Sequence, residues 1–490
     1  MRAATATRGL RANEAMIVRE LDIAPRVLRD LAVRYPQRYP VLFDSAAEGA
    51  SQSLSRTSVL VARPSGAIWL DAAGRVHAEG EVPRGVLIEG EGFLSALERW
   101  VRRAAASSWA RAPGPSSLPF TGGWAVLLGY EIAAEIEPRL DLPDCRAPHP
   151  WRSFALRVPC AIVHDRLAGK VQAIAEEDAA PALEALLDDA RECARAHAGS
   201  TDTPPGPLEV ARVSEEDPSA YLERVRRGKE YIRAGDIYQT NLSRAWRVEL
   251  RAADVGRLYE RLRAVNPAPF AALAQWRGAA VLSSSPERLV RVADGRIETR
   301  PIAGTRPRSR RPGEDAREAA ALVAHPKERA EHIMLVDLER NDLGRVCEAG
   351  TVRVEELMSI ESYAHVHHIV SNVTGRLRQE VTPIEALRAV FPGGTITGCP
   401  KFRCMQIIAE LEAEGRGAYT GSLGLIGRDG KIDFNILIRT MTLVGKRVEF
   451  RAGAGIVADS DPERELEETR AKARGLLAAF GEIPRAGAAA

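Results

Sequence analysis

The sequence predicts an α+β fold, and three observations lead to that class. Short apolar segments broken by glycine and proline fill the region before Gln172. Later in the chain, two strand pairs close on Asp-Gly turns, at Asp294-Gly295 and Asp429-Gly430. The helical patterns occur in blocks and do not alternate regularly with strands, which argues against a doubly wound parallel sheet.

The N-terminal region predicts a β-rich unit with few helices. Apolar runs at 58–64, 66–74 and 85–92 have the length and composition of strands. A helical pattern occupies 93–105, and a second, acidic one covers 180–198. The next residues, "GSTDTPPGP", have the composition of a linker.

The C-terminal region has clearer helix boundaries. Asp217 followed by Pro218 predicts a helix start, and Gly235 suits its end. Helices are expected at 325–344 and 461–480, and we expect a Ser460 to Glu463 capping box to open the second one. Before them, at 236–250, "DIYQTNLSRAWRVEL" alternates as a strand whose polar face could line a cavity. We assign Gln239, Asn241 and Ser243 to that face, and Tyr238, Leu242, Trp246 and Val248 to the other.

Five segments are expected along the chain. The first fifteen residues superficially resemble an organelle transit peptide, but their composition equally suits a disordered extension, with the true start at Met16, which we prefer. The segments are an extension at 1–15, an N-terminal region at 16–196, a linker at 197–216, a C-terminal domain at 217–482 and a disordered tail at 483–490.

Composition favours a soluble cytoplasmic enzyme that acts on a small molecule. Lys and Arg total 68 and Asp and Glu total 66, giving a net charge of +2, so no global field points to nucleic acid or an anionic membrane. Six cysteines occur without a C-x-x-C pair, which argues for reduced thiols and against a disulfide framework or a zinc site. No apolar run approaches the roughly 20 residues needed to span a bilayer.

Carboxylates on two expected helices could meet at a magnesium ion. Glu328 and Glu331 are three residues apart and share a helix face. In the last helix, Glu465 and Glu468 share a face with Lys472. Two carboxylates that leave positions for water and substrate oxygen suit Mg²⁺, whereas a solvated face of ion pairs would give the same spacing.

Other polar groups suggest an anion-binding pocket. "SYAHVHHIVSN" supplies His365, His367 and His368 without the further partners that zinc requires, so one histidine orienting a substrate and a structural role both stay open. "FPGGTITGCPKFRC" joins a glycine-rich turn to a helix, although it lacks the Walker A pattern. Glu287, which follows Pro286, would be an acid if its surroundings raise its pKa.

Together these stretches resemble the chorismate-using enzymes, closest to aminodeoxychorismate synthase component I and similar also to anthranilate synthase component I. The resemblance implies large antiparallel sheets packed face to face, helices on the outside, and intertwined N-terminal and C-terminal halves. It makes 217–482 the chorismate-binding catalytic domain. The motifs that carry it occur in the family's order: "YQTNLSR", "SPERL", "RPIAGTRPR", "PKERAEHIMLVDLERNDLGRV", "GGTITGCPK" and "AGAGIVADSDPERELEETRAKA".

The resemblance also implies a role for each candidate site residue. Glu331 and Glu468 would hold Mg²⁺ against the ring carboxylate of chorismate. Glu287 would be the general acid for the departing hydroxyl, with His368 and Thr305 as further catalytic residues. The expected substrate-binding residues are Gln239, Ala303, Gly304, Thr395, Tyr419, Arg439, Gly453, Gly455 and Lys472.

The expected nucleophile is ammonia. Water-using relatives carry a lysine base where this chain has Gln239, and an amide cannot deprotonate water. The chain has no glutaminase nucleophile motif, so a separate glutamine amidotransferase subunit is the expected ammonia donor. "YQTNL" and "FPGGTITG" resemble aminodeoxychorismate synthase, so we expect 4-amino-4-deoxychorismate as the product, on the para-aminobenzoate and folate route.

Two alternative functions and one further binding expectation remain open from the sequence. Ala303 is the anthranilate synthase form of "PIAGT", where many aminodeoxychorismate synthases carry lysine, so anthranilate and pyruvate are the alternative products. The "LFDS" stretch, Leu42 to Ser45, resembles a tryptophan-sensing motif, and tryptophan binding in the N-terminal half is a further expectation. A catalytically inactive sensor of an aromatic metabolite is the non-enzyme alternative, against which the intact carboxylate set argues.

Overall fold

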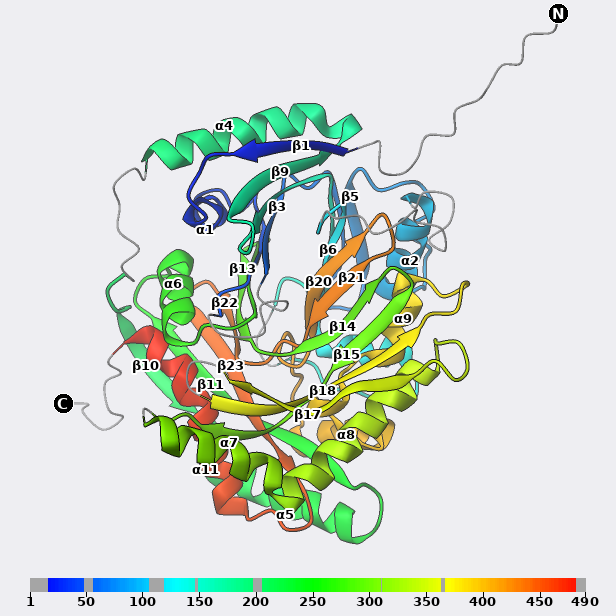
Figure 1. Cartoon of the computed structure of the whole chain (residues 1–490), viewed down its shortest axis with the longest axis vertical. Helices are drawn as coiled ribbons and strands as arrows, with labels where there is room; N and C mark the ends of the chain where they lie inside the picture. Colours follow the sequence, from blue (N-terminus) through cyan, green and yellow to red (C-terminus); the bar gives the residue numbers. More distant parts are fainter. Residues whose placement is uncertain are drawn as a thin grey trace, which may run out of the picture.

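A computed structural model of the chain describes residues 16–47, 56–104, 119–145, 149–196, 205–309, 311–362 and 366–481 (Figure 1). The expected extension, the tail and the first part of the linker lie outside the described residues, as do His365 and the side chain of Thr305. None of the described helices is long and apolar enough to cross a membrane.

Two large sheets organise the described chain, and every strand pair in them is antiparallel. The first sheet joins strands from both halves of the chain, because β2 of the N-terminal half pairs with β12 of the C-terminal half. Its order is β1 (Met16–Leu21), β9 (Lys170–Glu176), β8 (Cys160–Asp165), β3 (Thr57–Ala62), β2 (Val41–Asp44), β12 (Phe270–Trp276), β13 (Ala279–Ser285), β22 (Thr440–Val444), β23 (Arg447–Ile456), β11 (Gln239–Leu250) and β10 (Val210–Glu215), with β19 (Gly398–Cys399) beside β11.

The second sheet mixes the two halves in the same way, through the pairing of β20 with β6. Its order is β16 (Ile302–Pro307), β18 (Val366–Arg376), β15 (Arg296–Arg300), β14 (Arg288–Ala293), β21 (Ile432–Asn435), β20 (Ser422–Gly427), β6 (Gly123–Leu128), β7 (Ser153–Val158), β4 (Gly66–Leu70) and β5 (Val76–Gly80). In addition, β17 (Arg353–Ser362) pairs with β18.

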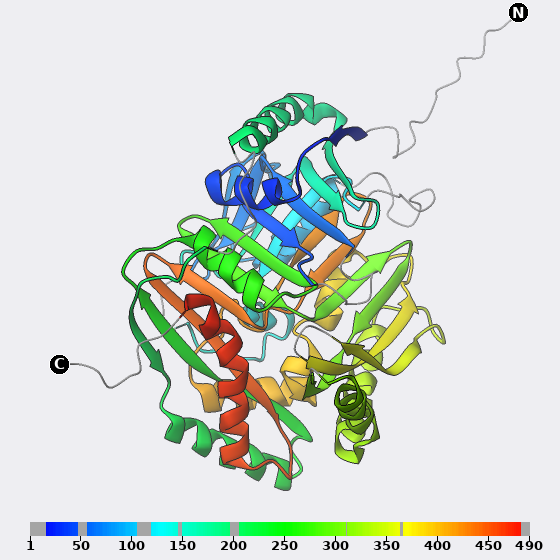
Figure 2. The same ribbon diagram turned by 60° about the vertical axis from the view of Figure 1, so that its left-hand side comes forward.

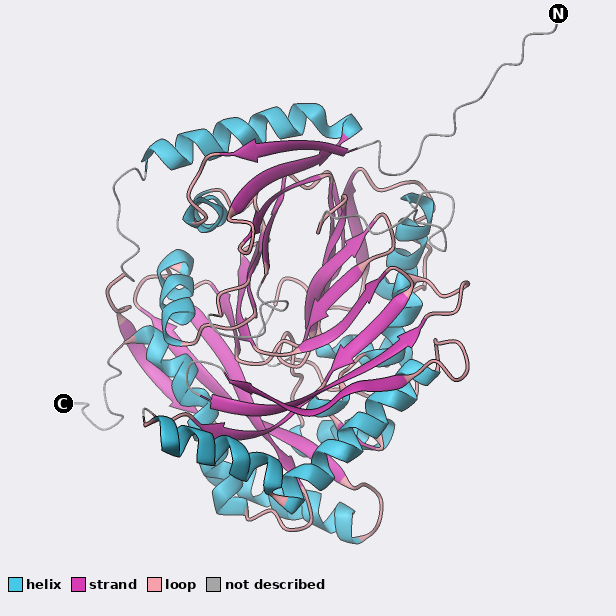
Figure 3. Ribbon diagram, viewed as in Figure 1, coloured by secondary structure: helices cyan, strands magenta, loops and turns pink. Residues whose placement is uncertain are grey.

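Helices cover the outer faces of both sheets (Figure 3). The α-helices are α1 (Arg26–Arg34), α2 (Phe93–Ala104), α3 (Ala133–Ile136), α4 (Ala180–Ala196), α5 (Pro218–Arg233), α6 (Val255–Val265), α7 (Pro312–Ala324), α8 (Pro326–Gly344), α9 (Pro383–Val390), α10 (Lys401–Glu412) and α11 (Pro462–Leu477). Short 3-10 turns are η2 (Tyr130–Ile132), η3 (Glu177–Ala179), η4 (Gly394–Ile396) and η5 (Ala478–Phe480).

The core is layered in the way that two facing sheets require. One apolar cluster lies between the sheets and includes Phe154 of β7 and Trp276 of β12, whose rings are 5.2 Å apart. A second cluster joins the outer face of the first sheet to α1, α4, α6 and α11. A third joins the second sheet to α2, α8 and α9. The predicted α+β class, with face-to-face sheets and intertwined halves, is confirmed.

Most predicted boundaries in the C-terminal half are confirmed. The Asp294-Gly295 turn closes β14 onto β15, and both residues have positive φ. Asp217 caps α5 by accepting a hydrogen bond from the Ser219 amide. The expected capping box of α11 is wrong, because Asp461 is the N-cap, accepting from the Arg464 amide at 2.9 Å.

Two details of the strand prediction differ from the structure. Tyr238 precedes β11 and is 70% exposed, so it does not share the buried face with Leu242, Trp246 and Val248. The apolar run at 85–92 forms no strand. All six cysteines are free thiols.

Candidate functional site

Two glycines of β23 define the floor of the candidate site. A Cβ on Gly455 would lie 2.3 Å from Gln239 Nε2 and 3.3 Å from Glu331 Oε1. A Cβ on Gly453 would lie 2.7 Å from the Asn241 side-chain oxygen. The strand therefore needs glycine where polar side chains of β11 and α8 approach its backbone. Gln239 donates to Glu331 at 2.6 Å, which fixes both side chains above Gly455.

Lys472 and Glu468 of α11 reach the same strand. Lys472 Nζ donates to the Gly453 carbonyl at 2.9 Å and pairs with Glu468 at 2.8 Å. Glu331 of α8 therefore approaches β23 at Gly455, while Glu468 of α11 is linked to β23 through Lys472, which contacts Gly453 (Figure 2). The lysine and Glu468 side chains are 41% and 49% exposed, so this edge of the site opens to solvent.

Glu287 lies in the buried part of the site, between β13 and β14. Its side chain is only 4% exposed, and burial raises its pKa to about 8. The Ile302 amide, 3.4 Å from Oε1, and the Thr395 hydroxyl oppose that shift, as does the charge of Arg439. Thr395 lies beside the carboxyl without forming a regular hydrogen bond. At neutral pH, Glu287 is therefore mostly a protonated carboxylic acid.

His368 of β18 faces the β16 segment and is neutral at physiological pH. Its Nδ1 lies 3.2 Å from the Gly304 carbonyl, an acceptor only, so Nδ1 carries the proton and the lone pair is on Nε2. Burial lowers its pKa to about 3, and the charges of Arg439 and Lys472 lower it further. Gly304 has φ of +66°, and a Cβ there would lie 2.9 Å from Glu328 Oε2, so only glycine suits the position.

The remaining candidate residues belong to the same region. Ala303 pairs with Ile369 and is 8% exposed. The Tyr419 hydroxyl would lie 2.9 Å from a Cβ on Gly453, and burial raises the tyrosine pKa to about 12. Arg439 has positive φ, and its charge acts on both Glu287 and His368. Thr305 pairs with His368 through its backbone. The structure thus connects the predicted residues through shared neighbours.

The acidic groups fit a magnesium ion that takes its other ligands from water and substrate. Among the described residues, no cluster of three or more His, Cys, Asp or Glu side chains could hold a metal alone. The donors present are the carboxylates of Glu331 and Glu468 and the buried amide oxygen of Gln239, which has no hydrogen-bond partner in the described chain. An all-oxygen set of this kind suits a hard divalent cation.

A buried ion-pair network that sequence analysis missed supports the floor of the site. Glu412 pairs with Arg416 at 2.7 Å and with Arg451 at 3.2 Å, and all three side chains are at most 2% exposed. Arg416 also donates to the Asn241 carbonyl at 2.7 Å, and its guanidinium lies 5.7 Å from the Tyr419 ring centre. Glu412 and Arg416 have the common i,i+4 spacing of helical ion pairs, and Arg451 is far from both in sequence, so only the tertiary structure reveals the network.

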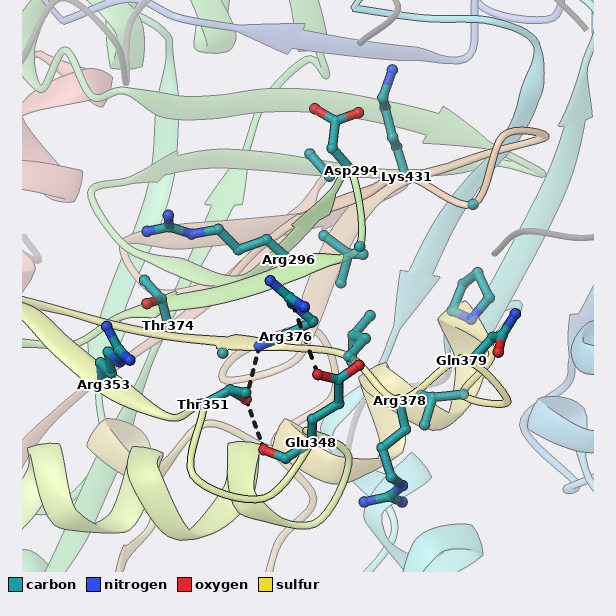
Figure 4. Close-up of a pocket in the computed structure, with 18 of the residues that line it drawn as sticks. Asp294, Arg296, Glu348, Thr351, Arg353, Thr374, Arg376, Arg378, Gln379 and Lys431 are labelled. Carbon is teal, nitrogen blue, oxygen red and sulfur yellow. Dashed lines mark hydrogen bonds and ion pairs between the residues drawn. The ribbon is translucent and has the colours of Figure 1, made fainter. Parts of the chain in front are cut away.

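A wide cavity lies away from these residues. It has a volume of about 860 Å³ and is formed by the ends of β14, β15, β17 and β18 (Figure 4). Its lining is basic, but Arg296 pairs with Glu355, and Arg376 lies 3.8 Å from Glu348. None of the predicted site residues lines this cavity.

A second cavity, of about 690 Å³, includes part of the "LFDS" stretch. Asp44 and Ser45 line it together with Phe270. Asp44 is buried and pairs with Arg263 at 2.8 Å, while the Tyr259 hydroxyl donates to it at 3.3 Å. The acidic residue of the stretch is therefore already neutralised within the fold.

Comparison with known proteins agrees with the fold and identifies the family. The family model described as "chorismate binding enzyme" matches residues 64–478. Anthranilate synthase component 1 of Streptomyces coelicolor is 45% identical over 395 residues, covering 77% of this chain and 76% of the relative. The corresponding protein of Aquifex aeolicus is 40% identical over 379 residues, covering 74% of each.

Solved structures give the same result. The crystal structure of anthranilate synthase component I from Streptococcus pneumoniae TIGR4 aligns with a TM-score of 0.74 at 32% identity, covering 86% of this chain and 92% of that one. Escherichia coli MenF, the menaquinone-specific isochorismate synthase, has a TM-score of 0.67 at 20% identity, covering 95% and 94%, and supports the fold alone. The chain belongs to the family of chorismate-binding enzymes.

Proposed function

We propose that the chain is the chorismate-converting subunit of an anthranilate synthase, which uses ammonia to make anthranilate and pyruvate. The observation that carries the proposal is the pairing of a protonated Glu287 with a neutral His368 in one buried site. Such a pair supplies both an acid and a base at neutral pH. The identity of 40% and 45% to two anthranilate synthase components supports the same product.

The acid has a specific task in this reaction. Hydroxide is a poor leaving group, so the ring hydroxyl must take a proton as ammonia attacks. Glu287 donates that proton, and the hydroxyl leaves as water. The buried position of Glu287 keeps the proton in place until substrate arrives, because ionisation of the carboxyl is unfavourable there.

The base completes the elimination. After ammonia has added, the ring must lose a proton from the carbon that carries the new amino group, and the enolpyruvyl group must leave as pyruvate. We assign His368 to accept that proton: the lone pair is on Nε2 because the Gly304 carbonyl holds the Nδ1 hydrogen, and the negative charges of bound substrate would raise its low pKa. Gln239 cannot activate water, so attack by water would lack a base at this position.

Binding of a dianionic substrate needs fixed positive charge. Arg439 and Lys472 lie close enough to His368 to lower its pKa, and the Gly453 and Gly455 segment gives the substrate close access to the backbone. Bound Mg²⁺ would neutralise the ring carboxylate. Glu331 and Glu468 are the residues that would hold it.

The aminodeoxychorismate alternative keeps one specific observation in its favour. The side-chain oxygen of Asn241 has no hydrogen-bond partner among the described residues, although it faces Gly453 and Tyr419. An amide at this place could bind an aminated intermediate and delay the loss of pyruvate. The "YQTNL" resemblance points in the same direction, whereas Ala303 does not.

One experiment separates the possibilities. The purified chain is incubated with chorismate, Mg²⁺ and ammonium. Anthranilate fluorescence together with pyruvate supports the proposal. A product that becomes para-aminobenzoate only after a separate lyase is added supports the alternative. If chorismate is not consumed, the chain is a sensor and both proposals fail.

Two further parts of the proposal concern partners. A glutamine amidotransferase subunit would supply ammonia, so glutamine should support turnover only when that subunit is added. Tryptophan would bind the cavity beside Asp44 and Ser45. The ion pair of Asp44 with Arg263 leaves that carboxylate little capacity for an added ammonium group, so we expect weak binding, which calorimetry with tryptophan measures.

A further inference from the structure

Burial of the acid creates a problem that the residues described so far do not solve. Glu287 is almost fully enclosed, so little solvent reaches its carboxyl. Once it has protonated the departing hydroxyl, Glu287 is a buried carboxylate that must regain a proton before the next turnover. Because direct access from solvent is so restricted, buried polar groups close to Glu287 are candidates for the path by which the proton returns.

A second buried carboxyl, that of Glu339, lies in the same region as Glu287. Glu339 of α8 is 5% exposed and faces the same two segments as Glu287. Its carboxyl lies beside the Gly394 amide and Thr299, whereas Glu287 lies beside Thr395 and Ile302. A Cβ on Gly394 would lie 3.3 Å from Glu339 Oε1, Thr395 is the next residue, and the charge of Glu339 raises the pKa of Glu287, so the two carboxyls share one buried region.

Charged side chains connect Glu339 to the partly exposed Lys401. Asp342 is three residues further along the same face of α8 and forms an ion pair with Lys401 of α10. The Lys401 side chain is 14% exposed and also donates to the Val390 carbonyl at 3.2 Å. The charged groups that face Glu339 are therefore Asp342 on its own helix, Lys401 on α10 and Glu287 beside β14.

We propose that Glu339 is a proton relay that reprotonates Glu287 after each turnover. This inference rests on the proposed function of Glu287 as the acid. Glu287 gives its proton to the hydroxyl, which leaves as water. The Glu339 carboxylic acid then passes its proton to the Glu287 carboxylate and regains one from solvent by way of the Asp342 and Lys401 edge. One proton enters from solvent for each molecule of water formed, and the ammonium group formed by the attack of ammonia releases one proton, so no net proton is taken up.

The proton affinities of the two carboxyls support the relay. Burial raises the pKa of Glu339 to about 7, and the charge of Asp342 raises it further, while Lys401 opposes the shift. The pKa of Glu287 is about 8. Both carboxyls therefore hold a proton far more strongly than an exposed glutamate does, so their proton affinities are no strong barrier to transfer between them. Two adjacent buried carboxyls are costly to fold, so packing alone is a poor reason for Glu339.

The test compares Glu339→Gln with the wild-type chain in rapid-quench and steady-state assays. In the variant, Glu287 begins protonated, so the first turnover should proceed within about threefold of the wild-type rate. Later turnovers should be at least about tenfold slower, giving a burst of one product per site, because general acid catalysis contributes on this scale. The solvent deuterium isotope effect on steady-state turnover should rise. Asp337→Asn, an exposed carboxylate of α8, is the matched control.

Each outcome decides between the claims. If Glu339→Gln slows the first and later turnovers equally, or slows neither, the relay is wrong. If the variant does not fold, as judged by circular dichroism, Glu339→Asp is used and should retain turnover without a burst. Wild-type activity in Glu287→Gln would show that Glu287 is not the acid, and the relay proposal would then fail as well.

Discussion

Replacing Glu287 with glutamine should both abolish turnover and make stability less dependent on pH. The folded-state pKa of Glu287 is about 8 and its ordinary value 4.5, so the unfolded chain ionises first as pH rises. Stability is then highest at low pH and is lost between the two values. At about 1.4 kcal/mol per pKa unit, the full loss is about 5 kcal/mol, of which roughly 2.5 kcal/mol falls between pH 6 and pH 9.

The assay is denaturant unfolding of the wild-type chain and of Glu287→Gln at pH 6 and pH 9. The wild-type chain should lose about 2.5 kcal/mol more than the variant over this interval, because glutamine does not ionise. Asp337→Asn serves as the control and should follow the wild-type chain. Parallel pH dependence of wild type and Glu287→Gln would mean that Glu287 ionises normally in the fold, and the acid assignment would then be refuted.

Three further predictions follow from particular contacts. Glu331→Ala should abolish turnover and its dependence on Mg²⁺, and near-wild-type activity would rule out Glu331 as a ligand. Gly455→Ala should lower turnover about 100-fold with little change in stability, since the new Cβ meets the ends of the Gln239 and Glu331 side chains and shifts both; unchanged kinetics would contradict the close packing. Asp461→Ala should lower the unfolding free energy by about 1 kcal/mol. A larger loss from Glu463→Ala would indicate that the Ser460 to Glu463 capping box forms after all.

Local sequence patterns predicted the elements of the C-terminal half because their boundaries depend on local chemistry. The Asp-Gly turns need residues that tolerate positive φ, and Asp217 with Pro218 starts α5 whatever packs against it. Tyr238 was misassigned because alternation alone does not say where a strand begins. At α11, adjacent Ser460 and Asp461 were both acceptable caps, and backbone geometry selected the second.

The candidate site could be predicted residue by residue only through family resemblance. Spacing alone could not show that Glu331 and Glu468 approach the same strand, because that depends on how α8 and α11 are placed around β23. The buried network of Glu412, Arg416 and Arg451 escaped prediction for a related reason. Its importance comes from complete burial, and burial of a charged residue is decided by the whole fold.

The catalytic half of the chain is inseparable from the N-terminal half for a physical reason. The pairings of β12 with β2 and of β20 with β6 join residues from opposite sides of the expected linker. Removing the N-terminal half would expose the edges of β12 and β20, both rich in apolar side chains, and would open the core between the sheets. The site needs both sheets, because Gly453 and Gly455 lie in the first and His368 in the second. The boundary predicted at 197–216 therefore separates segments of sequence that fold as one structure.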